Sequence, residues 1–181
     1  MVEVLVSLVI FAFGLLGAAG LQLSTLRSNQ YSASAAVATS LAREYGEIMQ
    51  SLPSAVVSTS SGASSLFISD TSTYTSGTNA FACKGSGATC DSAALVDSLK
   101  KDWALRVAAA LPGGKATVCR DSEPRDSTGT LKLWSDGCDG DGDLVVVKVG
   151  WTGKDNVIDA NNERPKLVIS LMGNLQDFVT P

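Results

Sequence analysis

The 181-residue chain has 14 lysines and arginines against 18 aspartates and glutamates, so its formal net charge is −4, and its sequence pI is near 4.7. This acidic balance argues against a basic surface that binds nucleic acid directly. The chain has no histidine, which excludes Ser–His and Cys–His catalytic pairs and histidine-ligated zinc. We therefore expect a non-catalytic protein that does not bind nucleic acid directly.

Residues 1–26 form an apolar tract of membrane-spanning length. Between Val4 and Leu23 only Ser7 and Gln22 are polar, and about 20 apolar residues suffice for a helix to cross the hydrocarbon core of a bilayer. No lysine or arginine precedes the tract, whereas a secretory signal peptide begins with a basic segment. We expect a retained transmembrane and assembly helix that carries one soluble domain.

Glu3 is the one charged residue in this tract. A carboxylate in a membrane-spanning helix costs about 2.5–3.5 kcal/mol on insertion scales. Such a residue needs a partner or a function, unless its side chain reaches back to water at the membrane surface. We select Glu3 as a candidate functional residue.

Residues 27–52 are expected to continue the helix in amphipathic form, and Pro53 marks its end. Small and apolar side chains recur at steps of three and four and so share one face: Tyr31, Ser34, Ala38, Leu41, Tyr45, Ile48 and Leu52. We expect this face to pack on the soluble domain. The charged side chains are expected to point elsewhere: Arg27, Arg43, Glu44 and Glu47.

Residues 53–181 are predicted to form a globular head, which begins with a Ser/Thr-rich loop. A short helix is expected over about 91–111, because Asp91 suits its N-cap and Pro112-Gly113-Gly114 its stop. Antiparallel strands follow within about 115–172, at Ala116–Arg120, Thr130–Trp134, Leu144–Trp151 and Leu167–Met172. A sheet packed on the C-terminal half of the long helix gives an α+β fold.

Four cysteines, Cys83, Cys90, Cys119 and Cys138, form an even set in a domain tethered by an N-terminal anchor. This setting favours disulfides in an oxidising periplasm or at a cell surface. Four cysteines allow three connectivities, and the sequence does not choose among them, although Cys83 with Cys90 and Cys119 with Cys138 are the nearest neighbours. Metal binding is disfavoured, because the chain has no histidine and no Cys-x-x-Cys.

The segment Asp136-Gly-Cys-Asp-Gly-Asp-Gly-Asp143 contains three alternating carboxylates, Asp139, Asp141 and Asp143. Oxygens at this spacing can converge on Ca²⁺. An EF-hand loop counted from Asp139 needs Gly at its sixth position and Glu at its twelfth, where this chain has Leu144 and Gly150. An Asp/Gly-rich turn is therefore the favoured interpretation. Calcium is the weaker alternative, and no other cofactor is expected.

Taken together, these features resemble the type IV pilin family. Its processed subunits begin with an apolar helix that bears a glutamate near the new N-terminus, here within Val2-Glu3-Val4-Leu5-Val6. Three later segments are similar to minor pilins of the PilV type: Leu111-Pro-Gly-Gly114, Val118-Cys-Arg-Asp121, and Cys138-Asp139-Gly140 leading into Val145-Val-Val-Lys-Val-Gly-Trp151. The resemblance implies the type IV pilin fold, in which the long helix packs on an antiparallel sheet.

The resemblance also implies a role for Glu3, which would align or neutralise the N-terminal amine of a neighbouring subunit as it enters the filament. The expected partners are other minor pilins, the major pilin and the inner membrane before assembly, with a tip adhesin as an optional further partner. The head would lie in the periplasm before assembly and on a cell-surface pilus afterwards. Family precursors carry a basic leader, cut before a methylated Phe, and Met1 stands where the third mature residue falls. We therefore expect a trimmed chain or a misassigned start.

The expected function is that of a minor pilin, which helps to initiate pilus assembly, is incorporated near the pilus tip, and supports twitching motility, adhesion or DNA uptake. One alternative is a minor pseudopilin of a type II secretion system, which shares the anchor and the methylated start. A second alternative, from a different class, is a membrane-anchored calcium-dependent adhesin or binding domain.

Overall fold

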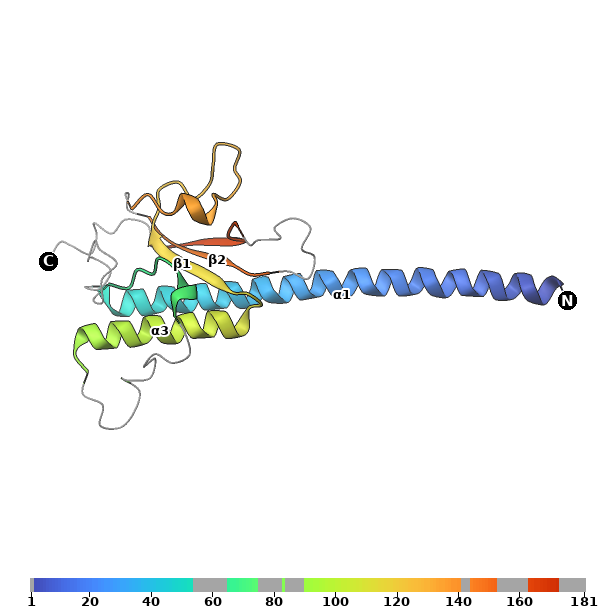
Figure 1. Cartoon of the computed structure of the whole chain (residues 1–181), viewed down its shortest axis with the longest axis horizontal. Helices are drawn as coiled ribbons and strands as arrows, with labels where there is room; N and C mark the ends of the chain where they lie inside the picture. The colour runs from blue at the N-terminus through green and yellow to red at the C-terminus, as the bar shows by residue number, and fades with distance from the viewer. Residues whose placement is uncertain are drawn as a thin grey trace. The chain divides into compact units, whose positions relative to one another are not determined.

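Figure 1 shows the computed structural model of the chain, whose described residues are 2–53, 65–74, 83, 90–140, 144–152 and 163–172. The elements are, in chain order, helix α1 (Val2–Ser51), the 3₁₀ helix η1 (Thr71–Thr73), helix α3 (Ser92–Ala110), strand β1 (Lys115–Arg120), the 3₁₀ helix η2 (Trp134–Asp136), strand β2 (Val145–Gly150) and strand β3 (Leu167–Met172). The chain divides into two compact units, Met1–Ala36 and Val37–Pro181, which we call the N-terminal unit and the head.

The N-terminal unit contains the apolar part of α1. Its large apolar side chains, from Val2 to Leu26, are exposed. By length and composition, α1 is the one helix in the described part of the chain that could cross a membrane. The hydroxyls of Ser7 and Thr25 donate hydrogen bonds to carbonyls four residues earlier, at 2.8 and 3.0 Å, so these polar groups are satisfied inside the helix. These features support an N-terminal membrane anchor.

In the head, α1 buries one face made of small and apolar side chains: Ala38, Leu41, Ala42, Tyr45, Gly46 and Met49. The expected packing face is confirmed at Ala38, Leu41 and Tyr45. It is wrong at Tyr31, whose side chain is 55% exposed. The buried face is also wider than expected, because the helix contacts both α3 and the sheet. At Gly46 an added Cβ would lie 3.1 Å from Cδ2 of Leu171 in β3, so a small residue allows the close approach.

Helix α3 begins and ends where the sequence predicts. The Asp91 carboxylate accepts a hydrogen bond from the backbone N–H of Ala94 at 2.7 Å, which makes it the N-cap. After Leu111 the chain turns at Gly113, whose φ of +56° favours glycine. At Gly114 an added Cβ would lie 2.4 Å from the carbonyl oxygen of Val107, so no larger residue fits there. The helix stop therefore needs glycine at 113 for its backbone conformation and at 114 for lack of space.

Helix α3 packs on α1 through one aromatic side chain. Trp103 is fully buried, and its ring centroid lies 4.4 Å from that of Tyr45. Arg106 of α3 also forms an ion pair with Glu44 of α1 at 2.6 Å. The expectation that Glu44 points away from the domain is therefore wrong, because α3 lies beside that edge of the helix.

The strands form an antiparallel sheet in the order β1-β2-β3. Val147 of the central strand β2 lies opposite Val118 and Ile169, and Ile68 adds an isolated bridge to Val118. Every residue of β2 is buried, because α1 and α3 cover one face of the sheet and the segment 121–140 covers the other (Figure 1). The α+β arrangement predicted from the sequence is confirmed.

The predicted strand at Thr130–Trp134 is wrong. Leu131 makes an isolated bridge with Arg125, and Trp134–Asp136 form η2. The Asp126 carboxylate accepts hydrogen bonds from the backbone N–H groups of Thr128 and Thr130, at 2.9 and 3.0 Å. Side chain-to-backbone bonds of this kind compete with pairing in a sheet. The segment therefore turns back on itself and covers β2 instead of joining the sheet.

Candidate functional site

Glu3 lies in the first turn of α1 and is exposed. A carboxylate in this position interacts favourably with the positive end of the helix dipole and the unpaired N–H groups there. It belongs to the N-terminal unit, whereas the other predicted site residues belong to the head.

The four cysteines form two disulfides, Cys83–Cys90 and Cys119–Cys138, and none is free. The Cα atoms of the two pairs are 5.9 and 6.3 Å apart, within the usual range for a disulfide. Of the three connectivities that the sequence left open, the structure has the one that joins nearest neighbours. The second disulfide links the end of β1 to the segment that precedes β2.

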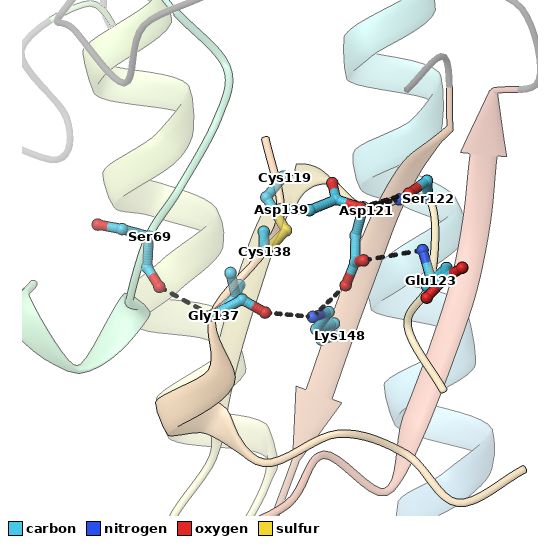
Figure 2. The surroundings of a disulfide bond; sticks show 10 residues. Ser69, Cys119, Asp121, Ser122, Glu123, Gly137, Cys138, Asp139 and Lys148 are labelled. Atoms are coloured by element: carbon cyan, nitrogen blue, oxygen red, sulfur yellow. Dashed lines mark hydrogen bonds and ion pairs between the residues drawn. A yellow bond between two sulfur atoms is a disulfide. The ribbon is translucent and has the colours of Figure 1, made fainter. Parts of the chain in front are cut away.

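A short loop, Gly137–Gly140, is held against the sheet by this disulfide and by three polar contacts, most of which appear in Figure 2. The ammonium group of Lys148 donates to the carbonyl of Gly137 at 2.8 Å. The Asp139 carboxylate accepts from both the backbone N–H and the hydroxyl of Ser122. The N–H of Gly140 donates to the carbonyl of Arg120 at 3.2 Å. We call Gly137–Gly140 the stapled loop.

Lys148 and Asp121 form a buried ion pair beneath the stapled loop, 2.5 Å apart (Figure 2). Their side chains are 4% and 2% exposed. The other Asp121 oxygen accepts from the backbone N–H of Glu123 at 3.1 Å. Removal of one partner would leave the other charge buried without compensation, which is far more costly than loss of an exposed pair. The pair therefore fixes β2 to the segment that follows β1.

A pocket of about 310 Å³ opens beside the disulfide. Its walls come from β1, β2, η2, the stapled loop and the segment just before η1. They include Phe67, Cys119, Arg120, Trp134, Gly137 and Lys148. Cys119 and Cys138 were predicted from the sequence as site residues, whereas Arg120 and Trp134 were not. The one local signal for Arg120 was its position directly after Cys119. Nothing near it in the sequence indicated that Phe67 and Trp134 line the same pocket.

Of the three predicted calcium ligands the structure describes one, Asp139, whose carboxylate accepts a hydrogen bond from the backbone N–H of Ser122. Asp141 and Asp143 lie outside the described residues. Within residues that the structure describes, no group of three or more His, Cys, Asp or Glu side chains is placed to hold a metal ion. Calcium binding by the Asp-rich segment stays a prediction.

Comparisons of the chain with protein-family models, with curated proteins and with solved structures found no match.

Proposed function

We propose that this chain is a minor type IV pilin, a non-catalytic subunit that is stored in the inner membrane and then joins a surface pilus near its tip. The observation that carries the proposal is that the two parts of α1 have different environments. Its N-terminal part presents apolar side chains outward, with one carboxylate in the first turn. Its C-terminal part buries one face in the head, from Ala38 to Met49. One helix thus serves both as an anchor and as a structural element of the head.

Exposed apolar side chains of this kind have two favourable environments, the hydrocarbon of a bilayer and the apolar sides of neighbouring helices. A subunit that moves from membrane to filament exchanges one for the other at little cost in apolar burial. The charge of Glu3 then decides how a subunit fits among its neighbours, since a buried carboxylate needs a compensating cation. The N-terminal amine of an adjacent subunit is such a cation, and the two groups would set the axial register between subunits.

The role of Glu3 is tested by Glu3→Ala in cells that assemble pili. We expect the variant to fold and to enter the membrane, but to be strongly depleted from pili that are sheared from the cell surface. Glu47→Ala is the matched control, because Glu47 is also an exposed glutamate on α1 but belongs to the head. Recovery of Glu3→Ala in sheared pili at the level of Glu47→Ala would contradict the assigned role.

Deletion of the gene separates this proposal from the pseudopilin alternative, which has the same architecture. Cells are imaged for surface pili, and secreted enzymes are assayed in the same culture. Sparse or missing pili with normal secretion would support the minor pilin. Normal pili with failed secretion would assign the chain to a type II secretion system instead. Normal pili together with normal secretion would count against both.

A further inference from the structure

Two residues that line the pocket beside the disulfide each have a buried N–H group without a hydrogen-bond acceptor. These groups are Nε of Arg120 and Nε1 of Trp134. A buried donor that has lost water and found no acceptor destabilises the folded chain, and more so when it is charged. Buried polar groups in proteins are nearly always paired, so two such donors on residues that line one pocket indicate a missing acceptor.

The charge in this pocket is unbalanced at Arg120. Lys148 also lines the pocket, but Asp121 neutralises it. Arg120 has no ion pair within the described residues, and its guanidinium carbon lies 5.8 Å from the centre of the Phe67 ring. Stacking on an aromatic face leaves the in-plane N–H groups of a guanidinium available to an acceptor. The pocket therefore offers one uncompensated cation and one indole donor, next to aromatic walls.

We propose that this pocket binds a carboxylate attached to a small flat or apolar group. A carboxylate is planar and accepts two parallel hydrogen bonds from a guanidinium, and its remaining lone pairs can accept from an indole N–H. A phosphate would bring more acceptor oxygens than the two orphan donors can satisfy. The rings of Phe67 and Trp134 and the disulfide supply apolar surface for the group that carries the carboxylate.

The shape of the pocket favours such a small ligand. Its volume of about 310 Å³ is at the lower end of ligand pockets, which run from about 300 to 1,000 Å³. One wall is the stapled loop, which a disulfide, the Lys148 ammonium group and the Ser122–Asp139 bonds hold in place. A wall fixed before binding lowers the ordering cost that a ligand has to overcome. This inference does not depend on the proposed function.

The carboxylate has two possible sources, a free organic acid or an acidic side chain of a peptide. The test uses the full chain, labelled with ¹⁵N, in uncharged detergent micelles. The indole N–H resonances are assigned with Trp→Phe variants. The chain is titrated with benzoate, with benzamide as the neutral analogue of the same shape, and with a blocked Gly-Glu-Gly peptide.

We expect the Trp134 indole resonance to move saturably with a carboxylate probe and not with benzamide. The Trp103 indole, whose proton is bound to the Leu41 carbonyl, should stay in place. Arg120→Gln should weaken binding at least tenfold, whereas Arg43→Gln, an exposed arginine on α1, should leave it unchanged. A response to benzoate alone identifies a free acid as the ligand, and a comparable response to the peptide identifies an acidic side chain.

Three results would overturn the inference: no saturable shift with either carboxylate, an equal shift with benzamide, or unchanged affinity in Arg120→Gln. The Trp103 resonance also reports whether Arg120→Gln is folded. If it is not, the contrast between benzoate and benzamide in the unmodified chain decides the question.

Discussion

The indole Nε1 of Trp103 donates a hydrogen bond to the backbone carbonyl of Leu41 at 2.9 Å, across 62 positions of sequence. Trp103 is fully buried, and so is the Tyr45 ring against which it packs. A helix carbonyl normally accepts within its own helix, so this second bond ties α3 directly to the backbone of α1. The contact connects the anchor-bearing helix with the rest of the head.

Trp103→Phe should lower the free energy of unfolding of the head by about 1–3 kcal/mol, since it removes both a buried hydrogen bond and packed volume. Urea denaturation of the full chain in uncharged detergent measures the loss. Trp134→Phe is the matched control, because its indole N–H has no acceptor to lose. Equal losses in the two variants would show that the Leu41 bond contributes nothing.

Tyr45 makes the stability of the head decline at alkaline pH. Its hydroxyl donates to the Leu66 carbonyl at 2.6 Å, and burial, with a smaller contribution from Tyr74, raises its pKa well above the ordinary value of 10.0. The folded state therefore keeps a proton that the unfolded state releases above pH 10. Its stabilising effect is complete below that pH and declines by about 1.4 kcal/mol per unit as the pH rises further.

Tyr45→Phe should therefore unfold more easily at neutral pH, by about 1–3 kcal/mol, because the buried Leu66 carbonyl loses its donor. Above pH 10 its stability should decline less steeply than that of the unmodified chain. Tyr31→Phe, at an exposed tyrosine of the same helix, should keep the steep decline. Urea midpoints measured on both sides of pH 10 test this, and parallel pH profiles for all three proteins would refute the role of Tyr45.

Lys148→Met should destabilise the head by about 3–5 kcal/mol, because it leaves the Asp121 carboxylate buried without its cation. The double variant Asp121→Asn with Lys148→Met should regain part of this loss. Lys132→Met is the control: that lysine lies 4.0 Å from an exposed Glu123 carboxylate, and such pairs contribute about 0–1 kcal/mol. Urea denaturation again gives the comparison, and similar losses at both lysines would argue against a buried pair.

Cys119→Ser should lower the free energy of unfolding by about 3 kcal/mol, on the loop-closure relation for a bridge that spans 19 residues. It should also release one thiol, at Cys138, detectable with a thiol reagent under denaturing, non-reducing conditions. Cys83→Ser opens a shorter loop of 7 residues and should cost less, about 2.5 kcal/mol. Two reactive thiols in the unmodified protein would disprove one of the bridges.

The elements that the sequence predicted well are those with local signals. Asp91 and the Pro112-Gly113-Gly114 stop define α3 because capping and steric exclusion act within a few residues. Strand β2 was equally clear, since a run of valines in a central strand is buried on both faces. The sequence left all three disulfide connectivities open, because the choice among them depends on which cysteines the fold brings together.

The errors arise where contacts that the hydrophobic pattern does not contain decide the outcome. Leu131 and Leu133 alternate as in a strand, but the Asp126 carboxylate closes a turn just before them. The buried face of α1 includes Gly46, which no hydrophobicity pattern would select, because its burial reflects the nearness of Leu171. The pocket was not predictable at all: Phe67, Arg120 and Trp134 come from three separate segments.

The contacts between α1 and the rest of the head also determine how the head would respond to a pulling force. Leu41, Glu44 and Tyr45 each bind a different partner, the Trp103 indole, the Arg106 guanidinium and the Leu66 carbonyl. These three positions fall within about one helical turn, or about 6 Å of rise. Tension transmitted along α1 would load all three attachments in shear at the same time. The helix would then separate from the head in one cooperative rupture, without gradual peeling.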